Sequence, residues 1–343
     1  MQKNYIWFMI KTNVSLKVYN TFGIECSTKR FASFSSTEEL TSILKERNED
    51  ELLILGGGSN ILLTKDFDGL VIRNEIKGFD IIKEDNESVL IKSGAGETWH
   101  EFVLKCIENN FGGIENLSLI PGSVGASPMQ NIGAYGVEIK DVFHELEAYH
   151  IETGKLETFS HAACSFDYRE SVFKRALKNQ YIITSVTYRL TKKHETNTKY
   201  GAITAELEQM GIVTPTIKDI SNAVIAIRSS KLPNPKEIGN AGSFFKNPVV
   251  DTAILDTISK THSSVPNYPA SNGQVKLAAG WLIEQAGWKG KTFDNYGVHK
   301  NQALVLVNYS DCTGSDILNL STKIIKDIEF KFGLTLEREV NIL

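Results

Sequence analysis

The chain has few cysteines and histidines, and neither type is arranged as a metal site requires. Four of its 343 residues are cysteine, and no two of them form a Cys-x-x-Cys pair, so neither a zinc site nor a redox pair is indicated. The seven histidines show no metal-ligand spacing. We therefore expect no bound metal. Scattered thiols are typical of a reducing compartment, so we expect a cytoplasmic protein. The cysteines are Cys26, Cys106, Cys164 and Cys312.

Long apolar runs and long basic runs are also absent. No stretch approaches the ~18 apolar residues of a membrane span, so we expect no membrane insertion. A net charge of −4 without a basic run argues against a nucleic-acid partner. The apolar run Tyr5–Ile10 is shorter than the ~7–15 residues of a signal-peptide core. We expect an N-terminal extension or an edge strand there, and Met9 is a candidate natural start.

Prolines are missing from the first third of the chain, where the hydrophobic pattern predicts alternating helices and strands. Ser36 and Glu39 form a capping box, and Thr98 with Glu101 is expected to cap a second helix. All eight prolines lie at or beyond Pro121. The predicted helices are 37–48, 99–107, 202–210, 217–228, 250–259, 277–286 and 316–332. The predicted strands are 51–55, 70–73, 79–83, 89–92, 143–151, 156–159, 181–190, 303–307 and 334–343.

Glycine is abundant in three stretches, and the first follows a predicted buried strand. Gly56–Asn60 reads Gly-Gly-Gly-Ser-Asn. It is not a dinucleotide fingerprint, because Ile61 stands where the third glycine would be, and no Gly-Lys-Ser/Thr follows for a P-loop. Backbone N–H groups in such a turn can form an anion nest. From the residues alone, an anion nest and an ordinary turn are equally good interpretations of this stretch.

The second stretch, Pro121–Gly136, is sixteen residues long and would contribute little to a core. A long loop of this kind in a compact domain is usually a binding loop or disordered. Its apolar residues Val124, Met129, Ile132 and Tyr135 argue against disorder. We therefore expect it to bind a ligand.

The third stretch, Gly239–Pro248, mixes residue types that suit the wall of a binding site. Glycines allow close backbone approach, the Phe244–Phe245 pair excludes water, and Ser243, Lys246 and Asn247 offer polar groups. Three such loops in one chain predict a large anionic cofactor and a polar substrate.

Two further polar clusters are weaker signals. Tyr168 and Arg169 lie between carboxylates, and a surface ion pair explains them as well as a functional site does. Glu337 and Glu339 lie on one face of a predicted strand, with Arg338 on the other. Paired carboxylates can perform acid–base chemistry, but a solvated strand face is an equally simple interpretation.

Taken together, these stretches resemble the UDP-N-acetylenolpyruvoylglucosamine reductase family of flavoenzymes. They occur in the family's order from about residue 14 to the C-terminus. Tyr200–Gly201 resembles the variant that carries a mobile tyrosine loop. Ser123 and Ala126 vary within the flavin loop, Arg338 replaces a frequent proline, and the residues before Asn13 match nothing. The matching segments are Tyr19–Gly23, Gly56–Asn60, Gly94–Glu97 with Trp99 and His100, Leu119–Gly136, Tyr168–Ser171, Lys231–Pro235, Gly239–Pro248, Lys276–Ile283 and Leu336–Val340.

The resemblance implies an α+β fold of three domains, two of which form an FAD-binding unit of the vanillyl-alcohol-oxidase (PCMH) type. The FAD-binding subdomains would be residues 14–75 and 76–231, the second joined by a C-terminal strand at 333–343. Residues 232–332 would form an α+β domain that binds a UDP-sugar. The Pro-containing segment Lys231–Pro235 is the best candidate for that domain boundary.

The resemblance also implies the reaction, a step of peptidoglycan precursor synthesis and hence of cell-wall formation. NADPH would reduce non-covalently bound FAD and leave, and UDP-N-acetylglucosamine enolpyruvate would then be reduced to UDP-N-acetylmuramate. Arg169 would stabilise the enolate, since a guanidinium can contact two oxygens. Glu339 would orient or protonate the enol, and Ser243 would give the proton to carbon. We expect the chain to act as a monomer.

The remaining implied site residues bind the cofactor or the substrate. The implied cofactor-binding residues are Gly56, Gly57, Gly58, Ser59, Asn60, Ile120, Pro121, Gly122, Gly125, Ala126, Gln130, Asn131, Gly133 and Tyr135. The implied substrate-binding residues are Tyr168, Tyr200, Lys231, Asn247, Tyr268, Lys289 and Gln302.

Two other functions compete with this one. Another FAD-dependent oxidoreductase of the same fold, such as an alcohol or lactone oxidase, would have no use for Gly239–Pro248. A non-catalytic UDP-sugar-binding protein would not need Arg169, Ser243 and Glu339, and all three residues are present.

Overall fold

The computed structural model describes residues 10–343, so the element expected at Tyr5–Ile10 lies almost entirely outside the described residues. The described residues form two compact units. The first unit comprises residues 10–14, Thr28–Gly57 and Phe67–Arg228, and the second comprises Ser15–Ser27, Gly58–Asp66 and Ser229–Leu343.

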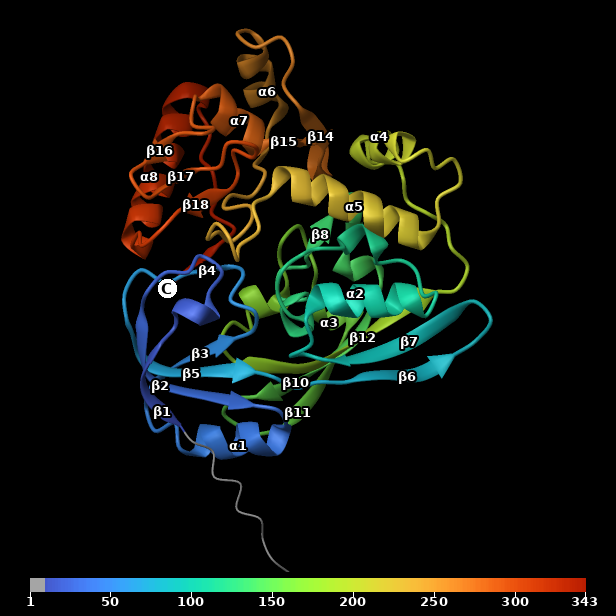
Figure 1. Cartoon of the computed structure of the whole chain (residues 1–343), viewed down its shortest axis with the longest axis vertical. Coiled ribbons are helices and arrows are strands. Elements are labelled where there is room, and N and C mark those ends of the chain that lie inside the picture. Colours follow the sequence, from blue (N-terminus) through green and yellow to red (C-terminus); the bar gives the residue numbers. More distant parts are fainter. Residues whose placement is uncertain (1–9) are drawn as a thin grey trace, which may run out of the picture. The chain divides into compact units, whose positions relative to one another are not determined.

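Helices and strands are mixed along both units, as an α+β fold requires (Figure 1). The helices are α1 (Thr37–Lys45), α2 (Trp99–Glu108), α3 (His161–Cys164), α4 (Gly201–Gln209), α5 (Ile217–Lys231), α6 (Thr252–Ser259), α7 (Ala279–Gln285) and α8 (Gly314–Phe332). The strands are β1 (Lys11–Ser15), β2 (Ser27–Phe34), β3 (Glu51–Leu55), β4 (Ile61–Leu62), β5 (Phe67–Asn74), β6 (Phe79–Glu84), β7 (Ser88–Gly94), β8 (Gly133–Ala134), β9 (Val137–Glu138), β10 (Phe143–His150), β11 (Leu156–Ser160), β12 (Tyr181–Thr191), β13 (Val249–Val250), β14 (Asn267–Pro269), β15 (Val275–Leu277), β16 (Thr292–Phe293), β17 (Tyr296–Val298), β18 (Leu306–Asn308) and β19 (Asn341–Ile342).

The first unit is built on two sheets. One has the order β1-β2-β5-β3, in which β2 and β3 both run parallel to β5. The other has the order β11-β10-β12-β7-β6 and is antiparallel throughout. Helix α1 buries Leu40 and Ile43 in one cluster with residues of β2 and β5, and Tyr149 and Ile182 of the second sheet join the same cluster. The two sheets therefore share a core.

A second core lies under α2 and positions the long loop that follows this helix. Trp99 and Phe102 of α2 pack on Tyr188 of β12, with ring centroids 5.8 and 5.0 Å from the tyrosine ring. The indole N–H of Trp99 donates to the carbonyl of Leu117 at 2.9 Å. This bond ties the start of the loop to the buried face of the helix.

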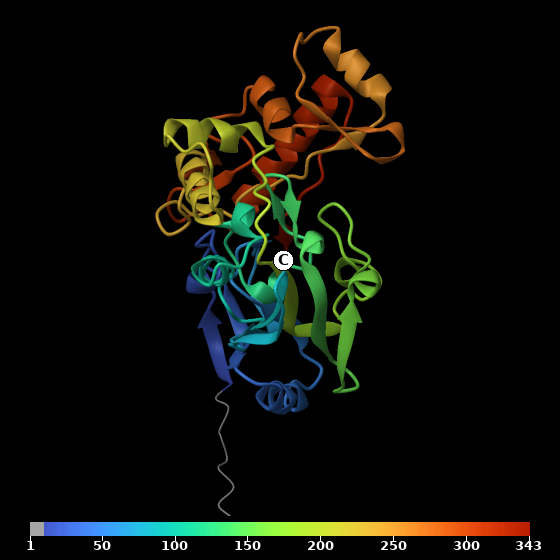
Figure 2. The same ribbon diagram turned by 90° about the vertical axis from the view of Figure 1, so that its right-hand side faces the viewer.

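Helices α4 and α5 form a separate apolar cluster of the first unit. Ile203 and Leu207 of α4 pack against Ile220, Val224 and Ile227 of α5, and the two helices lie side by side in both views (Figures 1 and 2). Met210, which caps the C-terminal end of α4, is exposed.

The second unit contains two three-stranded sheets, β13-β15-β14 and β16-β17-β18, and the two-stranded pair β19-β4. Its long helix α8 begins at a capping box in which Thr313 and Asp316 exchange hydrogen bonds, and it ends at Gly333 in the left-handed conformation (φ 69°). The stop at Gly333 was expected, because glycine adopts this conformation without a Cβ penalty. Phe244 and Phe245 are fully buried in this unit.

Several sequence-based boundaries are wrong. The final strand is only Asn341–Ile342, and its partner is β4, within the segment expected for the first subdomain. The strand predicted at 303–307 is β18, at Leu306–Asn308, and α5 continues to Lys231. Thr98 caps α2 without a side-chain hydrogen bond, so no capping box forms there. The division into three domains stays a prediction.

Candidate active site

The backbones of two glycine-rich turns in the first unit lie in direct contact with each other. Gly56 and Gly57 follow β3 directly. A Cβ on Gly57 would lie 2.9 Å from the Cα of Gly122, and a Cβ on Gly56 would lie 2.5 Å from the Oγ of Ser123. Only residues without a side chain allow these turns to approach so closely. Such a cradle of exposed peptide groups fits the pyrophosphate of a dinucleotide cofactor such as FAD.

The loop Pro121–Gly136 is ordered by its own hydrogen bonds and by four residues with positive φ angles. These are Gly122 (φ 122°), Asn131 (φ 46°), Tyr135 (φ 49°) and Gly136 (φ 80°). Gly125 packs so that a Cβ would lie 2.6 Å from the Cβ of Ala95. The loop is therefore a fixed structure rather than a disordered one, as its apolar residues predicted.

Asn131 connects this loop to the turn that carries Arg169. Its side chain is fully buried, and its Nδ2 donates to the carbonyl of Asp167 and to Oε2 of Glu138, both at 3.1 Å. Its Oδ1 accepts from the N–H of Lys140 at 3.0 Å. The amide group of Asn131 is thus engaged with protein groups, and its predicted role in binding the cofactor stays a prediction.

Arg169 lies at the tip of a tight turn with a left-handed backbone (φ 55°). Asp167 and Glu170 exchange two backbone hydrogen bonds of 3.1 Å across the turn. The Nη2 of Arg169 donates to the carbonyl of Gly133 at 2.6 Å, so the guanidinium is held against the glycine-rich loop. Tyr168 presents its ring 5.3 Å from the guanidinium carbon.

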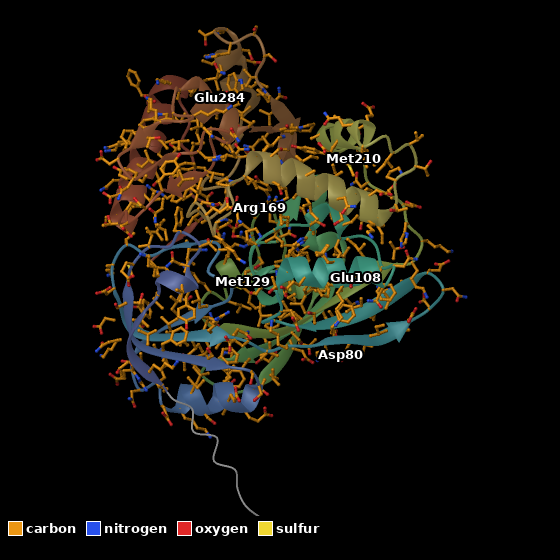
Figure 3. All side chains as sticks on the ribbon, in the orientation of Figure 1. Asp80, Glu108, Met129, Arg169, Met210 and Glu284 are labelled. Atoms are coloured by element: carbon orange, nitrogen blue, oxygen red, sulfur yellow. The ribbon has the colours of Figure 1, made fainter. Side chains whose placement is uncertain are left out.

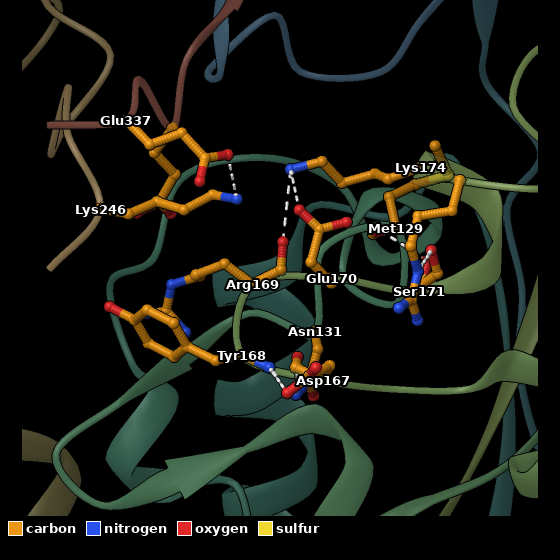
Figure 4. A network of polar contacts seen from close by, with 12 residues as sticks. Met129, Asn131, Asp167, Tyr168, Arg169, Glu170, Ser171, Lys174, Lys246 and Glu337 are labelled. Carbon is orange, nitrogen blue, oxygen red and sulfur yellow. Dashed lines mark hydrogen bonds and ion pairs between the residues drawn. The ribbon is translucent and has the colours of Figure 1, made fainter. Parts of the chain in front are cut away.

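The residues after Arg169 hold this turn in place (Figure 4). The Oγ of Ser171 donates to the carbonyl of Met129 at 2.6 Å. The Nζ of Lys174 donates to the carbonyl of Arg169 at 3.3 Å and lies 3.8 Å from the carboxylate of Glu170. Figure 3 shows where Arg169 and Met129 lie in the molecule. The loop and the turn therefore form one connected structure, which can place a fixed positive charge beside a bound ligand.

In the second unit, Ser243 follows Gly242, which has a left-handed backbone (φ 68°). Ser243 bridges to Val305, and the N–H of Phe244 donates to the carbonyl of Leu304 at 2.8 Å. The rings of Phe244 and Phe245 meet edge to face at 5.3 Å. The half-buried serine is thus carried on a rigid apolar support, as the mixed composition of this stretch predicted.

Glu339 lies on a segment that pairs with the one bearing Ser243. Its N–H donates to the carbonyl of Phe244 at 2.8 Å, and the N–H of Lys246 donates to the carbonyl of Glu337 at 2.9 Å. The backbone pairing places Glu339 opposite Phe244, the residue that follows Ser243, in the second unit. The side chain of Glu337 contacts the Nζ of Lys246 at 2.5 Å, and Lys246 is buried.

Arg338 points to the opposite face of the same segment. Its Nε and Nη2 donate to the hydroxyls of Ser321 and Thr322 on α8, at 2.8 and 2.7 Å. Glu337 and Arg338 therefore contact different elements, as alternation predicts, and the place of the Glu339 carboxylate on the same face as Glu337 stays a prediction.

The residues predicted to bind substrate lie in different settings. Asn247 accepts from the N–H of Ala279 through Oδ1 at 3.0 Å and so caps α7. Lys289 pairs with Glu284 at 2.9 Å, and Lys231 is the last residue of α5. Tyr268 is exposed on β14, and Gln302 lies in the turn before β18.

Tyr200 belongs to the first unit. It is the N-cap residue that directly precedes α4, and it is exposed.

Sequence reasoning assigned no role to two half-buried basic residues next to the glycine-rich loop, Arg228 and His100. The Nε of Arg228 donates to the carbonyl of Leu119 at 3.2 Å, and the Nδ1 of His100 accepts from the N–H of the same residue at 2.9 Å. Leu119 itself has a left-handed backbone (φ 57°). Burial lowers the pKa of Arg228, and a hydrogen bond to the hydroxyl of Tyr135 acts in the opposite direction. Such contacts leave no local sequence signal, because both residues act on a distant backbone segment.

No cluster of metal-ligating side chains occurs within residues 10–343. None of the helices found over the same range is long and apolar enough to span a membrane.

Comparison with known proteins covers nearly the whole chain. The model of an FAD binding domain matches residues 28–160, and the model of the C-terminal domain of UDP-N-acetylenolpyruvoylglucosamine reductase matches residues 234–343. A protein of Flavobacterium johnsoniae with that reductase name is 58% identical over 97% of this chain and 99% of its own. Reductases of the same name from Pseudomonas syringae pv. tomato and Amoebophilus asiaticus are both 49% identical over 97% of this chain, and over 98% and 99% of their own lengths.

Among solved structures, the chain is similar to the crystal structure of UDP-N-acetylenolpyruvylglucosamine reductase from Thermus caldophilus. The TM-score is 0.69, the sequence identity is 22%, and the match covers 98% of this chain and 99% of the other. At this identity the likeness shows the fold. Together with the matched FAD binding domain, it confirms the expected α+β fold with a PCMH-type FAD-binding unit.

Proposed function

This chain belongs to the family of UDP-N-acetylenolpyruvoylglucosamine reductases, and we infer that it reduces UDP-N-acetylglucosamine enolpyruvate to UDP-N-acetylmuramate. The reaction belongs to peptidoglycan precursor biosynthesis and uses FAD as cofactor and NADPH as co-substrate. The observation that carries this inference is the 58% identity over 97% of the chain, which extends over nearly all of both units.

FAD, when bound, transfers to the substrate the hydride that NADPH supplies. Gly56, Gly57 and Gly122 hold its pyrophosphate, because their backbones approach closely and present N–H groups to an anion. The predicted Gly58, Ser59 and Asn60 extend the same turn. The support for this assignment is the short distance from Gly57 to Gly122, which leaves no room for a side chain between the two turns.

Arg169 stabilises the negative charge that develops on the substrate carboxylate when hydride adds to the double bond. A guanidinium that is already fixed needs no reorganisation when the charge appears, and such preorganised donors are the usual source of large rate enhancements. The support for this role is the 2.6 Å bond from Arg169 to the carbonyl of Gly133 and the turn that holds the residue. Tyr168 lines the same place and contacts the substrate.

Ser243 donates a proton to the substrate carbon, and Glu339 orients or protonates the enol. A serine is a weak acid in water, but the carbon of an enolate is a strong base, so the transfer is feasible. The support for a joint role is the backbone pairing of the two segments in the second unit, in which Glu339 bonds to Phe244, next to Ser243 in the chain. A rigid support for such groups matters, because a small misplacement of a reacting group lowers the rate strongly.

The UDP portion of the substrate binds to polar residues of the second unit, and Tyr200 is assigned to substrate binding as well. Lysines suit the pyrophosphate as point charges. Asn247 uses its Oδ1 to cap α7, so its NH₂ group remains the donor that it can offer to a ligand. The assigned residues are Lys231, Asn247, Tyr268, Lys289 and Gln302.

The chain works as a cytoplasmic monomer without a nucleic-acid partner. All four cysteines are buried free thiols, and burial raises the pKa of each, to about 12 for Cys164 and Cys312. Such thiols are unreactive and fit a reducing compartment. The net charge of −4 disfavours a polyanion. Light scattering at micromolar concentration is expected to give the mass of one chain.

The visible spectrum of the purified protein tests this function. We expect a yellow protein that is bleached by NADPH and recoloured by UDP-N-acetylglucosamine enolpyruvate under anaerobic conditions. A protein that is bleached by an alcohol but not by NADPH would indicate another oxidoreductase of this fold. A colourless protein that binds the UDP-sugar and cannot be loaded with FAD would indicate a binding protein.

A further inference from the structure

Tyr135 lies where the glycine-rich loop meets two other segments of the first unit. Its ring is perpendicular to that of Tyr200, at an interplanar angle of 88° and a centroid distance of 5.3 Å. The same ring packs against the apolar cluster of α4 and α5. Tyr135 therefore contacts both the residue that begins α4 and the helix pair behind it.

Asn116 connects the same loop to the segment Lys192–Tyr200. Asn116 is almost fully buried, and its Nδ2 donates to the carbonyl of Tyr135 at 3.1 Å and to the carbonyl of Asn197 at 3.0 Å. The Nδ2 of Asn197 donates back to the carbonyl of Gly136 at 3.4 Å. One buried amide thus holds two backbone segments that are about sixty residues apart in the sequence.

The segment Lys192–Tyr200 has no buried residue, so apolar packing does not fix its position. Surface segments with few apolar contacts open easily unless polar contacts hold them. At its start, the Nε2 of His194 lies 3.0 Å from the carbonyl of Asn110. Near its end, the bonds made by Asn116 and Asn197 hold the segment next to Tyr200, together with the bond that the Oγ1 of Thr204 donates to the carbonyl of Thr198 at 2.8 Å.

Arg228 makes the arrangement continuous with the other end of the loop. Its guanidinium interacts electrostatically with the hydroxyl of Tyr135 and donates from Nε to the carbonyl of Leu119 at 3.2 Å. Leu119 precedes the loop and Tyr135 lies near its end, so one guanidinium on α5 holds both ends of the cofactor-binding loop.

We propose that Asn116 and Tyr135 are positioning residues that set Tyr200 for the UDP-sugar by linking its segment to the cofactor-binding loop. The substrate-covering tyrosine and the cofactor-binding loop then move as one structure. Because coupling between binding sites is reciprocal, a loop ordered by FAD favours the UDP-sugar, and the UDP-sugar favours FAD. This inference rests on the role proposed above for Tyr200.

The variant Asn116→Ala tests the link, with Asn109→Ala as the matched control. Asn109 also donates through Nδ2 to a backbone carbonyl, that of Lys105 at 2.8 Å, but it lies exposed at the end of α2. In FAD-loaded Asn116→Ala, the dissociation constant for UDP-N-acetylmuramate, measured from flavin absorbance, should rise about five- to thirty-fold, as the loss of two hydrogen bonds predicts. The control should match the wild type.

Limited trypsin digestion supplies a readout that does not depend on the reaction. Cleavage after Lys199, relative to cleavage after Lys178, should be faster in Asn116→Ala than in the wild type and the control, because the segment loses its anchor. Both lysines are exposed. Addition of FAD to the wild-type apoprotein should slow cleavage after Lys199 for the same reason.

A second variant, at the exposed end of the same link, shows whether the effect of Asn116→Ala comes from a folding defect at the buried site. Asn197→Ala removes two exposed side-chain bonds, to the carbonyl of Gly136 and from the N–H of Lys199, and keeps the backbone carbonyl that Asn116 bonds. We expect a smaller change in the same direction in both measurements. The proposal is overturned if folded, FAD-loaded Asn116→Ala and Asn197→Ala both keep the wild-type dissociation constant and cleavage rate. If Tyr200→Phe leaves the dissociation constant unchanged while Asn116→Ala still accelerates cleavage, the link stands and the role of Tyr200 in binding falls.

Discussion

Ser243 is the single residue whose chemistry should separate the two halves of the reaction. If it only protonates the substrate carbon, Ser243→Ala should leave flavin reduction by NADPH intact and slow reoxidation by the enolpyruvyl sugar by at least ~10²–10³. The backbone of residue 243 is held by its bridge to Val305, so alanine should not disturb the segment. Rapid-mixing absorbance resolves both steps. Equal slowing of the two steps would disprove the role of the hydroxyl.

The two glutamates near the C-terminus allow a matched comparison at the residue scale. We expect Glu339→Gln to be severely impaired in turnover and Glu337→Gln much less so, because only Glu339 is assigned to the reaction. The structure adds a reason for a mild effect at Glu337. Its carboxylate is largely exposed and contacts the Nζ of the buried Lys246, and glutamine still offers an oxygen that accepts from this ammonium group. Comparable steady-state rates for the two variants would show that the assignment is wrong.

At the scale of elements, the sequence predicted best where local signals agree. The hairpin of β10 and β11 and the stop of α8 at Gly333 follow from alternation and from a C-terminal glycine, and both are confirmed. The alternation of the C-terminal segment predicts one long strand. Within residues 10–343 this segment finds no continuous partner, since Arg338 bridges to Phe245 and only Asn341–Ile342 pairs with β4. Pairing depends on distant residues and cannot be read locally.

The same limit applies to the site. Glycine-rich stretches and clusters of polar residues marked the loops and the Arg169 turn from the sequence. Asn116, His100 and Arg228 were missed, because each is a single polar residue on an otherwise ordinary helix or turn. Their function is to bond backbone groups of the loop, and that becomes visible only when the loop is folded.

The bond between His100 and Leu119, just before the glycine-rich loop, should make the free energy of unfolding depend on pH. Burial, and then the charge of Arg228, lower the pKa of His100, while Glu101 raises it. The neutral ring accepts from the N–H of Leu119, and protonation would remove that acceptor. Because the pKa is lower in the folded state than the ~6.5 of an unfolded histidine, this contribution to stability is present above pH ~6.5. It is lost as the pH falls through the folded pKa.

We therefore expect His100→Gln to reduce the loss of stability between pH 7.5 and 5.5, because glutamine does not titrate and still offers an acceptor. Urea unfolding at the two pH values measures the free energy of unfolding of each protein. His299, whose pKa burial also lowers, is unchanged in both proteins and cancels in the comparison. An identical pH difference in the variant and the wild type would contradict the role of His100.

At the scale of the whole molecule, the cofactor should be part of the folded structure's stability. A ligand that binds only the folded state stabilises it by about 2.7 kcal/mol at one hundred times its dissociation constant. FAD in that excess should therefore raise the melting temperature of the apoprotein by several degrees.

The variant Gly57→Ala should abolish most of this gain in melting temperature, because a Cβ at 2.9 Å from the Cα of Gly122 forces the two turns apart. The control is Gly201→Ala, where a Cβ meets no atom within 4 Å. Calorimetry of each protein with and without FAD gives the gain directly, and an undiminished gain in Gly57→Ala would mean that the two turns do not hold the cofactor.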